Sequence, residues 1–136
     1  MEKTIINPAS LAKPVGFNHG ILTKGGQLLF LAGQDGSDAE GHIVGPGDMV
    51  AQLEQILKNF KAVVEEAGGQ MQDIVKLNIF VTSRAEYVKN LKQFGPLFLD
   101  YFGKYYPTMA LFEITSLFKP EAVIELEGIA VIPEKS

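Results

Sequence analysis

The sequence has no cysteine, only two histidines, and a single arginine, Arg84. Without cysteine the chain can form neither a disulfide framework nor a thiolate zinc site, and it has no cysteine nucleophile. The histidines, His19 and His42, lack metal-ligand spacing with any carboxylate, so we expect no metal. The chain is compatible with the reducing cytoplasm, where we expect it, and we expect it to work without a cofactor.

Basic charge and long apolar runs are also lacking. The net charge is -4 and the sequence pI is near 5.1, so no basic surface is available to hold a phosphate backbone. No apolar run approaches the roughly 20 residues that span a bilayer, and the first residues contain prolines and polar groups where a signal peptide is apolar. We therefore expect a soluble protein with no nucleic-acid partner and no membrane segment.

The 136 residues, of which 46% are hydrophobic, can bury one core, so we expect a single domain over residues 1–136. Residues 16–23 and 27–33 are short apolar runs that flank Lys24-Gly25-Gly26, and this pattern is typical of a β-hairpin. From Asp48, a suitable N-cap, apolar residues recur with a helical period as far as Gly68-Gly69.

In the second half of the chain, strand patterns and a helix pattern follow one another. Residues 74–82 are rich in β-branched side chains and predict a strand. Ser83 to Glu86 fits a capping box that starts a helix, which we expect Gly95-Pro96 to break or kink before it resumes to Phe102. Two further strands, residues 109–116 and 123–132, follow. The order ββαβαββ predicts an α+β fold with two helices packed on one face of a mixed sheet.

The last strand, VIELEGIAVI, carries Glu125 and Glu127 on one face and apolar residues on the other. Two helices can cover only one face of the sheet. Apolar residues on the face with the glutamates would then be exposed unless a second copy of the chain covers them, so we predict a homo-oligomer. A monomer with a loop as a lid is the alternative, but no loop here is apolar enough to serve.

An ionised carboxylate in such an interface costs several kcal/mol unless it is paired, hydrogen-bonded or protonated. One explanation is that both glutamates lie near a strand end and reach water, or bond backbone N-H groups of a neighbouring subunit. The other is that one of them is held in a cleft for acid-base work, where burial raises its pKa.

Several segments, in order and spacing, resemble the Rid family, also called YjgF or L-PSP: LLFLAGQ, NFKAVVEEAGGQMQDIVKLNIFVT, DYFG, YPTMALFEI and VIELEGIAV. The resemblance covers nearly the whole chain. It implies a homotrimer of chorismate-mutase-like subunits that binds a small molecule in a cleft at each subunit interface. The best-known members are imine/enamine deaminases.

The resemblance also assigns residues. Glu125 aligns with the glutamate that positions or activates the water, whereas Glu127 and Glu113 would have structural roles. The arginine that holds a substrate carboxylate in deaminating members is replaced by Met109. Three other departures also remove polar groups: Phe17 stands for a tyrosine, Ala32 for the hydroxyl before Gly33-Gln34, and Leu111 for a frequent cysteine.

We therefore expect the cleft to be more apolar than in relatives that act on amino-acid-derived imines, and simple 2-imino acids to be poor substrates. His19, Asn90 and Tyr106 are further candidates to line it. Tyr105, beside Tyr106, could also replace the lost tyrosine hydroxyl. Two functions remain open: hydrolytic deamination of an imine or enamine that lacks a carboxylate, with Glu125 directing water, or non-catalytic binding of a small metabolite or partner protein in the same cleft.

Overall fold

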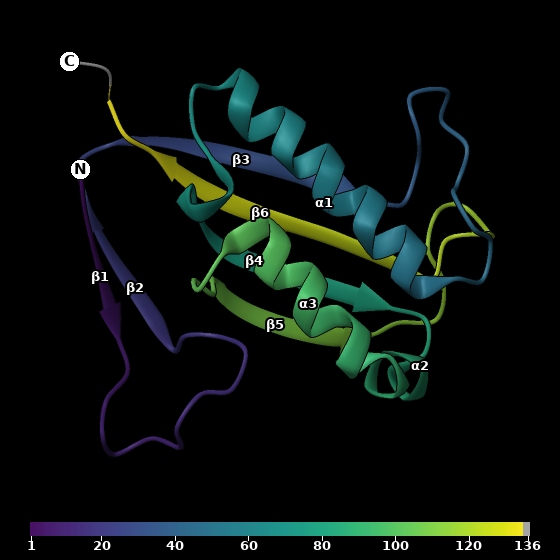
Figure 1. Cartoon of the computed structure of the whole chain (residues 1–136), viewed down its shortest axis with the longest axis horizontal. Coiled ribbons are helices and arrows are strands. Elements are labelled where there is room, and N and C mark those ends of the chain that lie inside the picture. Colours follow the sequence, from purple (N-terminus) through teal and green to yellow (C-terminus); the bar gives the residue numbers. More distant parts are fainter. Residues whose placement is uncertain (135–136) are drawn as a thin grey trace.

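The computed structural model describes residues 1–134 as two sheets and a layer of helices (Figure 1). A two-stranded sheet pairs β1 (Glu2–Ile6) with β2 (Gly20–Lys24). A four-stranded sheet has the order β3-β6-β4-β5, with β4 and β5 parallel and the other pairs antiparallel. Its strands are β3 (Gln27–Gln34), β4 (Ile74–Val81), β5 (Thr108–Glu113) and β6 (Ile124–Ile132). The helices α1 (Met49–Glu66), α2 (Arg84–Lys89) and α3 (Leu91–Phe102) and the short 3-10 turn Met71–Asp73 complete it.

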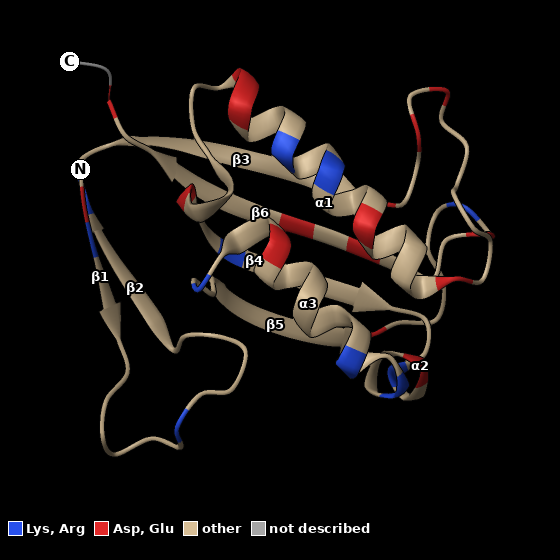
Figure 2. Cartoon of the chain, viewed as in Figure 1, with Lys and Arg blue, Asp and Glu red and all other residues tan. Residues whose placement is uncertain are grey.

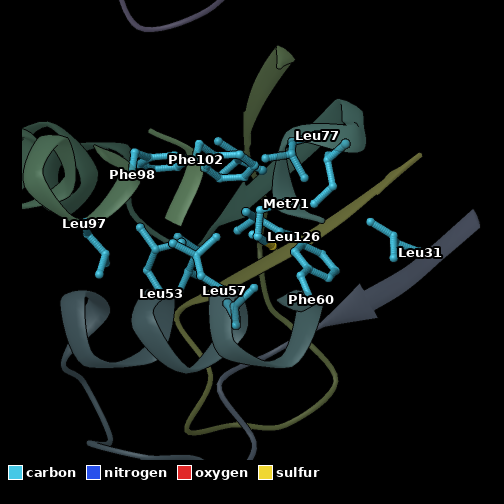
Figure 3. Packing of buried hydrophobic residues seen from close by; sticks show 14 of the residues in the cluster. Leu31, Leu53, Leu57, Phe60, Met71, Leu77, Leu97, Phe98, Phe102 and Leu126 are labelled. Carbon is cyan, nitrogen blue, oxygen red and sulfur yellow. The ribbon is translucent and has the colours of Figure 1, made fainter. Parts of the chain in front are cut away.

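Helix α1 forms as its sequence predicts. The Asp48 carboxylate accepts a hydrogen bond from the N-H of Ala51 at 3.0 Å, and the chain leaves the helix through Gly68, whose φ of 88° suits glycine. The apolar stripe of α1 is buried against the sheet. Figure 3 shows Leu53, Leu57 and Phe60 of this helix meeting Leu126 of β6 and Phe98 and Phe102 of α3 in one core.

The second helical region differs from its prediction. The break falls at Asn90, between α2 and α3, and Pro96 lies inside α3. A residue before proline normally avoids helical geometry because its Cβ meets the proline ring, but Gly95 has no Cβ, and burial of Phe94 and Phe98 holds the helix on both sides. Only one of the two hydrogen bonds of the predicted capping box is present. Ser83 accepts from the N-H of Glu86, whereas the Glu86 carboxylate lies near Lys89.

The predicted hairpin of the segments around Lys24-Gly25-Gly26 is wrong in this structure. β2 pairs with β1, a strand that the sequence pattern did not reveal, and β3 pairs with β6. Gly25 and Gly26 both have positive φ, 76° and 81°, and turn the chain from one sheet to the other. Figure 1 shows β1 and β2 across the end of the four-stranded sheet rather than alongside β3.

Helices α1 and α3 cover the same face of the four-stranded sheet, as the sequence predicts (Figure 1). The other face, which we call the open face, keeps large apolar side chains in solvent: Phe30 is 72% exposed and Leu28 65%. Val131, which the pattern also places there, is instead buried, because the Gly26 turn and Met1 pack against it. The open face is therefore only partly covered within one chain.

A buried amide fixes the loops at the end of the sheet where β6 begins. Gln52 of α1 is fully buried, and its Nε2 donates to the carbonyls of Gly45 and Glu121 at 3.2 and 3.1 Å. Its Oε1 accepts from the N-H of Val123 at 2.9 Å. A buried amide that satisfies its groups in this way holds a specific geometry, and it fixes Val123, the residue before β6 and two residues before Glu125.

Candidate functional site

A hollow of about 520 Å³ lies at the β5 edge of the sheet, on the side of the helices. It is of the size that small-molecule sites have. Its lining is almost entirely apolar or aromatic and comes from the loop before β2, from β4, β5, α2 and α3, and from the segment before β5: Val15, Gly16, Phe17, Ile79, Tyr87, Leu91, Phe94, Gly95, Phe98, Tyr106, Met109, Ala110 and Leu111. We call it the edge pocket.

Three of the residues expected in the cleft by resemblance, Phe17, Met109 and Leu111, line the edge pocket together with Tyr106. No lysine or arginine is among the lining residues, so the pocket offers no cation to a substrate carboxylate. The missing arginine is thus not replaced from elsewhere in the pocket. Arg84 is exposed, and its backbone N-H donates to Glu113 Oε1 at 2.8 Å, which gives Glu113 a role at the start of α2.

Phe17 reaches the edge pocket because two asparagines hold its loop. The Nδ2 of Asn18 donates to the carbonyl of Tyr106 at 2.7 Å, and its N-H donates to that of Pro107 at 3.2 Å. Asn7 Nδ2 in turn donates to Asn18 Oδ1 at 2.9 Å. Sequence reasoning missed both residues, since asparagines in an irregular loop carry no periodic signal.

Sequence reasoning also missed the aromatic side chains that α2 and α3 contribute. The rings of Tyr87 and Phe94 contact each other at a tilt of 45°, with their centroids 4.9 Å apart. Burial raises the pKa of Tyr87, so its hydroxyl stays protonated and can donate a hydrogen bond. The apolar period of residues 84–102 predicted a helix but not which side chains face the core and which a pocket.

Glu125 lies elsewhere, on the open face of β6. Its neighbours there are the backbone of Gly33 and the carboxylates of Asp35 and Glu127. Partial burial, together with the negative charges of Asp35 and Glu127, raises the pKa of Glu125 above its ordinary value. A Cβ at position 33 would come within 2.5 Å of Glu125 Oε2, so only glycine leaves room for the carboxylate in this position.

The loop that carries Asp35 is held in place from the other end of the chain. Lys119 Nζ donates to Ser37 Oγ at 2.7 Å and to the carbonyl of Gly41 at 2.6 Å, and Ser37 Oγ donates to the Asp35 carboxylate. Figure 2 shows acidic positions along β6 beside an uncharged β3. The Asp35 carboxylate is therefore held near Glu125 by the loop's own hydrogen bonds.

Three other candidates have their hydrogen-bonding groups engaged. Asn90 Nδ2 donates to the carbonyl of Glu86 at 2.8 Å, and Asn90 is not among the lining residues of the edge pocket. His19 Nε2 lies 2.7 Å from the carbonyl of Ala12. Tyr105 donates to the carbonyl of Ile74 at 2.6 Å, and burial raises its pKa, so of the two tyrosines before Pro107 only Tyr106 reaches the pocket.

Glu125 and the edge pocket lie on opposite faces of the sheet. Met109 pairs with the core residue Leu77, and the pocket contains side chains of α3. On β6 the residues on either side of Glu125, Ile124 and Leu126, point into the helical core, so alternation sends Glu125 to the open face. In the sheet, β4 also lies between β6, which carries Glu125, and β5, which carries Met109. One chain therefore does not bring Glu125, Ala32 and Gly33 together with Met109.

No group of three or more histidine or acidic side chains within residues 1–134 is arranged to hold a metal ion. Among the helices of the same residues, none combines the length and the apolarity that crossing a bilayer requires.

These features define a small α+β protein with helices on one sheet face, an open second face and an apolar pocket at the sheet edge. Residues 8–132 match the family described as Endoribonuclease L-PSP, and the chain belongs to this Rid/YjgF/L-PSP family.

Its relatives cover the whole length. A RutC family protein of Pyrococcus abyssi is 31% identical over 96% of this chain and 98% of its own. YyfB, a Rid family protein of Yersinia pestis, is 32% identical and superposes with a TM-score of 0.85 over 97% of this chain and all of its own. YyfA of the same organism is 30% identical but superposes with a TM-score of only 0.66, over 96% of this chain and all of its own.

Proposed function

We propose that the protein is a cofactor-independent hydrolase that deaminates an uncharged imine or enamine, and that it works as a homotrimer. The observation that carries the proposal is the position of Glu125, whose carboxylate lies in the space left by Gly33 and near Asp35 and Glu127, in surroundings that raise its pKa. A carboxylate with a raised pKa is a better base and can take a proton from water and return it to a leaving group.

The reaction balances with one water. An enamine first tautomerises to the imine. Glu125 takes a proton from water as the water oxygen bonds to the imine carbon, and passes it to the nitrogen as the second C-N bond of the imine breaks, which gives a carbinolamine. Glu125 then takes the proton of the carbinol hydroxyl and gives it to the nitrogen as the C=O bond forms and the remaining C-N bond breaks, so that ammonia and a carbonyl compound leave. No oxidant or metal is needed.

The edge pocket supports the choice of substrate. It has no cation and is lined by Phe17, Met109 and aromatic residues of α3. The carboxylate of a carboxylated imine would therefore give up its hydration there without gaining an ion pair. An imine with an aliphatic or aromatic group suits this lining. Because Glu125 lies on the other sheet face, the proposal requires that the edge pocket of one copy meets the open face of another.

The test follows ammonia release from 2-aminoacrylate and from an uncharged enamine of similar size. We expect turnover of the uncharged compound, little turnover of 2-aminoacrylate, and a loss of about 10²-fold or more in Glu125→Gln. Glu127→Gln, a matched change two residues along the same strand, should keep most of the activity. Both variants should keep the oligomer mass of the wild type.

The second candidate is non-catalytic binding of a small apolar metabolite, and the uncharged, largely apolar lining of the edge pocket favours it. Binding of an uncharged aromatic probe without turnover of either enamine, unchanged in Glu125→Gln, would support this function and reject the hydrolase. Equal turnover by Glu125→Gln would also reject the role of Glu125. The net charge of -4 gives no support to RNA as the ligand.

A further inference from the structure

Strand β3 has a free edge. Within residues 1–134 it pairs only with β6, and its eight residues carry no charge (Figure 2). Two of its side chains, Leu28 and Phe30, are 65% and 72% exposed. Proteins usually protect such an edge with charge, proline or a covering segment, because its unpaired N-H and C=O groups accept another strand.

Strand β2 has a free edge too. In the described residues it pairs only with β1, and the two-stranded sheet exposes Leu22, Ile5 and Ile6. An isolated two-stranded hairpin is marginally stable in water, so this one gains from a third strand. We call residues 1–24 the arm.

The sequence makes β2 and β3 natural partners. A two-residue Gly-Gly connection between two apolar runs is typical of a tight hairpin, and Gly25 and Gly26 have the positive φ values that such turns need. In this structure Gly25 and Gly26 connect β2 to β3, but the two strands do not pair with each other. The arm is held elsewhere on its own chain, where Lys3 donates to the carbonyl of Gln72 and Asn18 to those of Tyr106 and Pro107.

We propose that the arm is exchanged between copies: β2 of one chain pairs with the free edge of β3 in the next chain. The exchange rebuilds between chains the hairpin that the sequence encodes within one, which is how swapped oligomers form at low cost. YyfA and YyfB match this chain almost equally in sequence and superpose on it very differently, as expected if relatives place a segment differently around one core.

The exchange completes the proposed site, and in this respect it rests on the proposed function. In the hairpin register set by the two glycines, Ile21 faces Phe30, so the residues before β2 run toward Gly33 of the next copy. Phe17 and the edge pocket of one chain thus approach the Glu125 of another. Neither half of the site would then be complete in one chain.

The absence of cysteine permits a direct test. In an antiparallel hairpin with a two-residue turn, Ile21 and Phe30 form a non-hydrogen-bonded pair whose Cα atoms lie about 4.5 Å apart, which a disulfide can bridge. The double variant Ile21→Cys/Phe30→Cys is purified reduced, oxidised mildly, and run on a denaturing gel without reductant. Leu22→Cys/Phe30→Cys is the matched control, because Leu22 points to the other face of the strand.

We expect most of the double variant to run as covalent dimers and trimers that reductant returns to single chains, and the control to stay unlinked. A disulfide within one chain would show that each chain closes its own hairpin, and no disulfide would show that β2 does not pair with β3. Either outcome overturns the exchange. Since turnover is measured separately, a chain that closes its own hairpin and still releases ammonia would reject the exchange and leave the proposed function in place.

Discussion

At the scale of single residues, the carboxyl of Glu125 is the group most sensitive to its surroundings. Burial is the largest cause of its raised pKa, followed by Asp35 and then Glu127. With a folded-state pKa above the unfolded one, any stability that the group contributes is complete below its ordinary pKa and is lost as pH rises through the folded value. The difference in free energy of unfolding between Glu125→Gln and wild type should therefore shift in favour of the variant as the pH rises from acid to neutral.

This order of causes predicts how neighbours tune Glu125. Asp35→Asn removes the stronger of the two repelling charges, so we expect it to lower the pKa of Glu125 more than Glu127→Gln does. An NMR titration of the Glu125 carboxyl carbon in the three proteins measures this. If the pKa of Glu125 is unchanged in Asp35→Asn, the loop that Lys119 and Ser37 hold does not keep the Asp35 charge close to Glu125.

Gly33 has a different role, which is to leave space. In Gly33→Ala the new methyl group would meet Glu125 Oε2 at 2.5 Å and displace a flexible side chain rather than backbone. We expect turnover to fall by about 10²-fold, as misplacement of a reacting group by 1 Å can cost, while the free energy of unfolding falls by only about 1 kcal/mol.

Gly20→Ala is the matched control, since its methyl group would make only an ordinary 3.5 Å contact with Ile6 Cβ. It should change neither turnover nor stability appreciably. Urea unfolding and ammonia release separate the two effects, and full activity in Gly33→Ala would show that the Glu125 carboxylate need not stay where it is.

At the scale of elements, α3 shows how packing can override a local signal. Pro96 removes one N-H from the helix, and Gly95 relieves the clash that any larger residue would make with its ring. We predict that Pro96→Ala raises the free energy of unfolding by about 1–3 kcal/mol. Gly95→Ala alone should gain little or lose stability, whereas it should gain about 1 kcal/mol in the Pro96→Ala background, where the clash is gone.

Denaturant unfolding of the two single variants and the double variant tests this coupling. Position 95 is suitable because an added Cβ finds no atom within 4 Å other than those of its chain neighbours and of the backbone of its own helix. Additive effects would show that the glycine is not there to accommodate the proline.

The same scale shows what the sequence could predict. Helix α1 and strands β4 and β6 follow from apolar periods of 3.6 and 2, because each buries one regular face. The break at Asn90 and the position of β2 do not follow, since they depend on contacts with distant parts of the chain, such as Asn18 with Tyr106. For the site, the resemblance grouped Phe17, Met109 and Leu111, which line the edge pocket together. Alternation along the last strand predicted the face of Glu125, but no local pattern showed that the edge pocket lies on the other face of the sheet.

At the scale of the whole molecule, the open face is the surface on which we expect copies of the chain to meet. Leu28 and Phe30 leave a large apolar area of this face in solvent, and a second copy is the simplest cover. We predict that the wild type sediments with three times the 14.8 kDa mass of the chain. Phe30→Asp places a charge at the centre of the covered face, where an unpaired carboxylate costs several kcal/mol, and should therefore yield single chains.

Phe118→Asp is the matched control, because Phe118 is 96% exposed and belongs to the loop between β5 and β6 rather than to a strand of the open face. It should leave the mass unchanged. Sedimentation equilibrium gives both masses, and circular dichroism checks that Phe30→Asp stays folded. A wild type that is a single chain at micromolar concentration would reject the covered face, and with it any site shared between copies. A Phe30→Asp trimer would place the contact elsewhere.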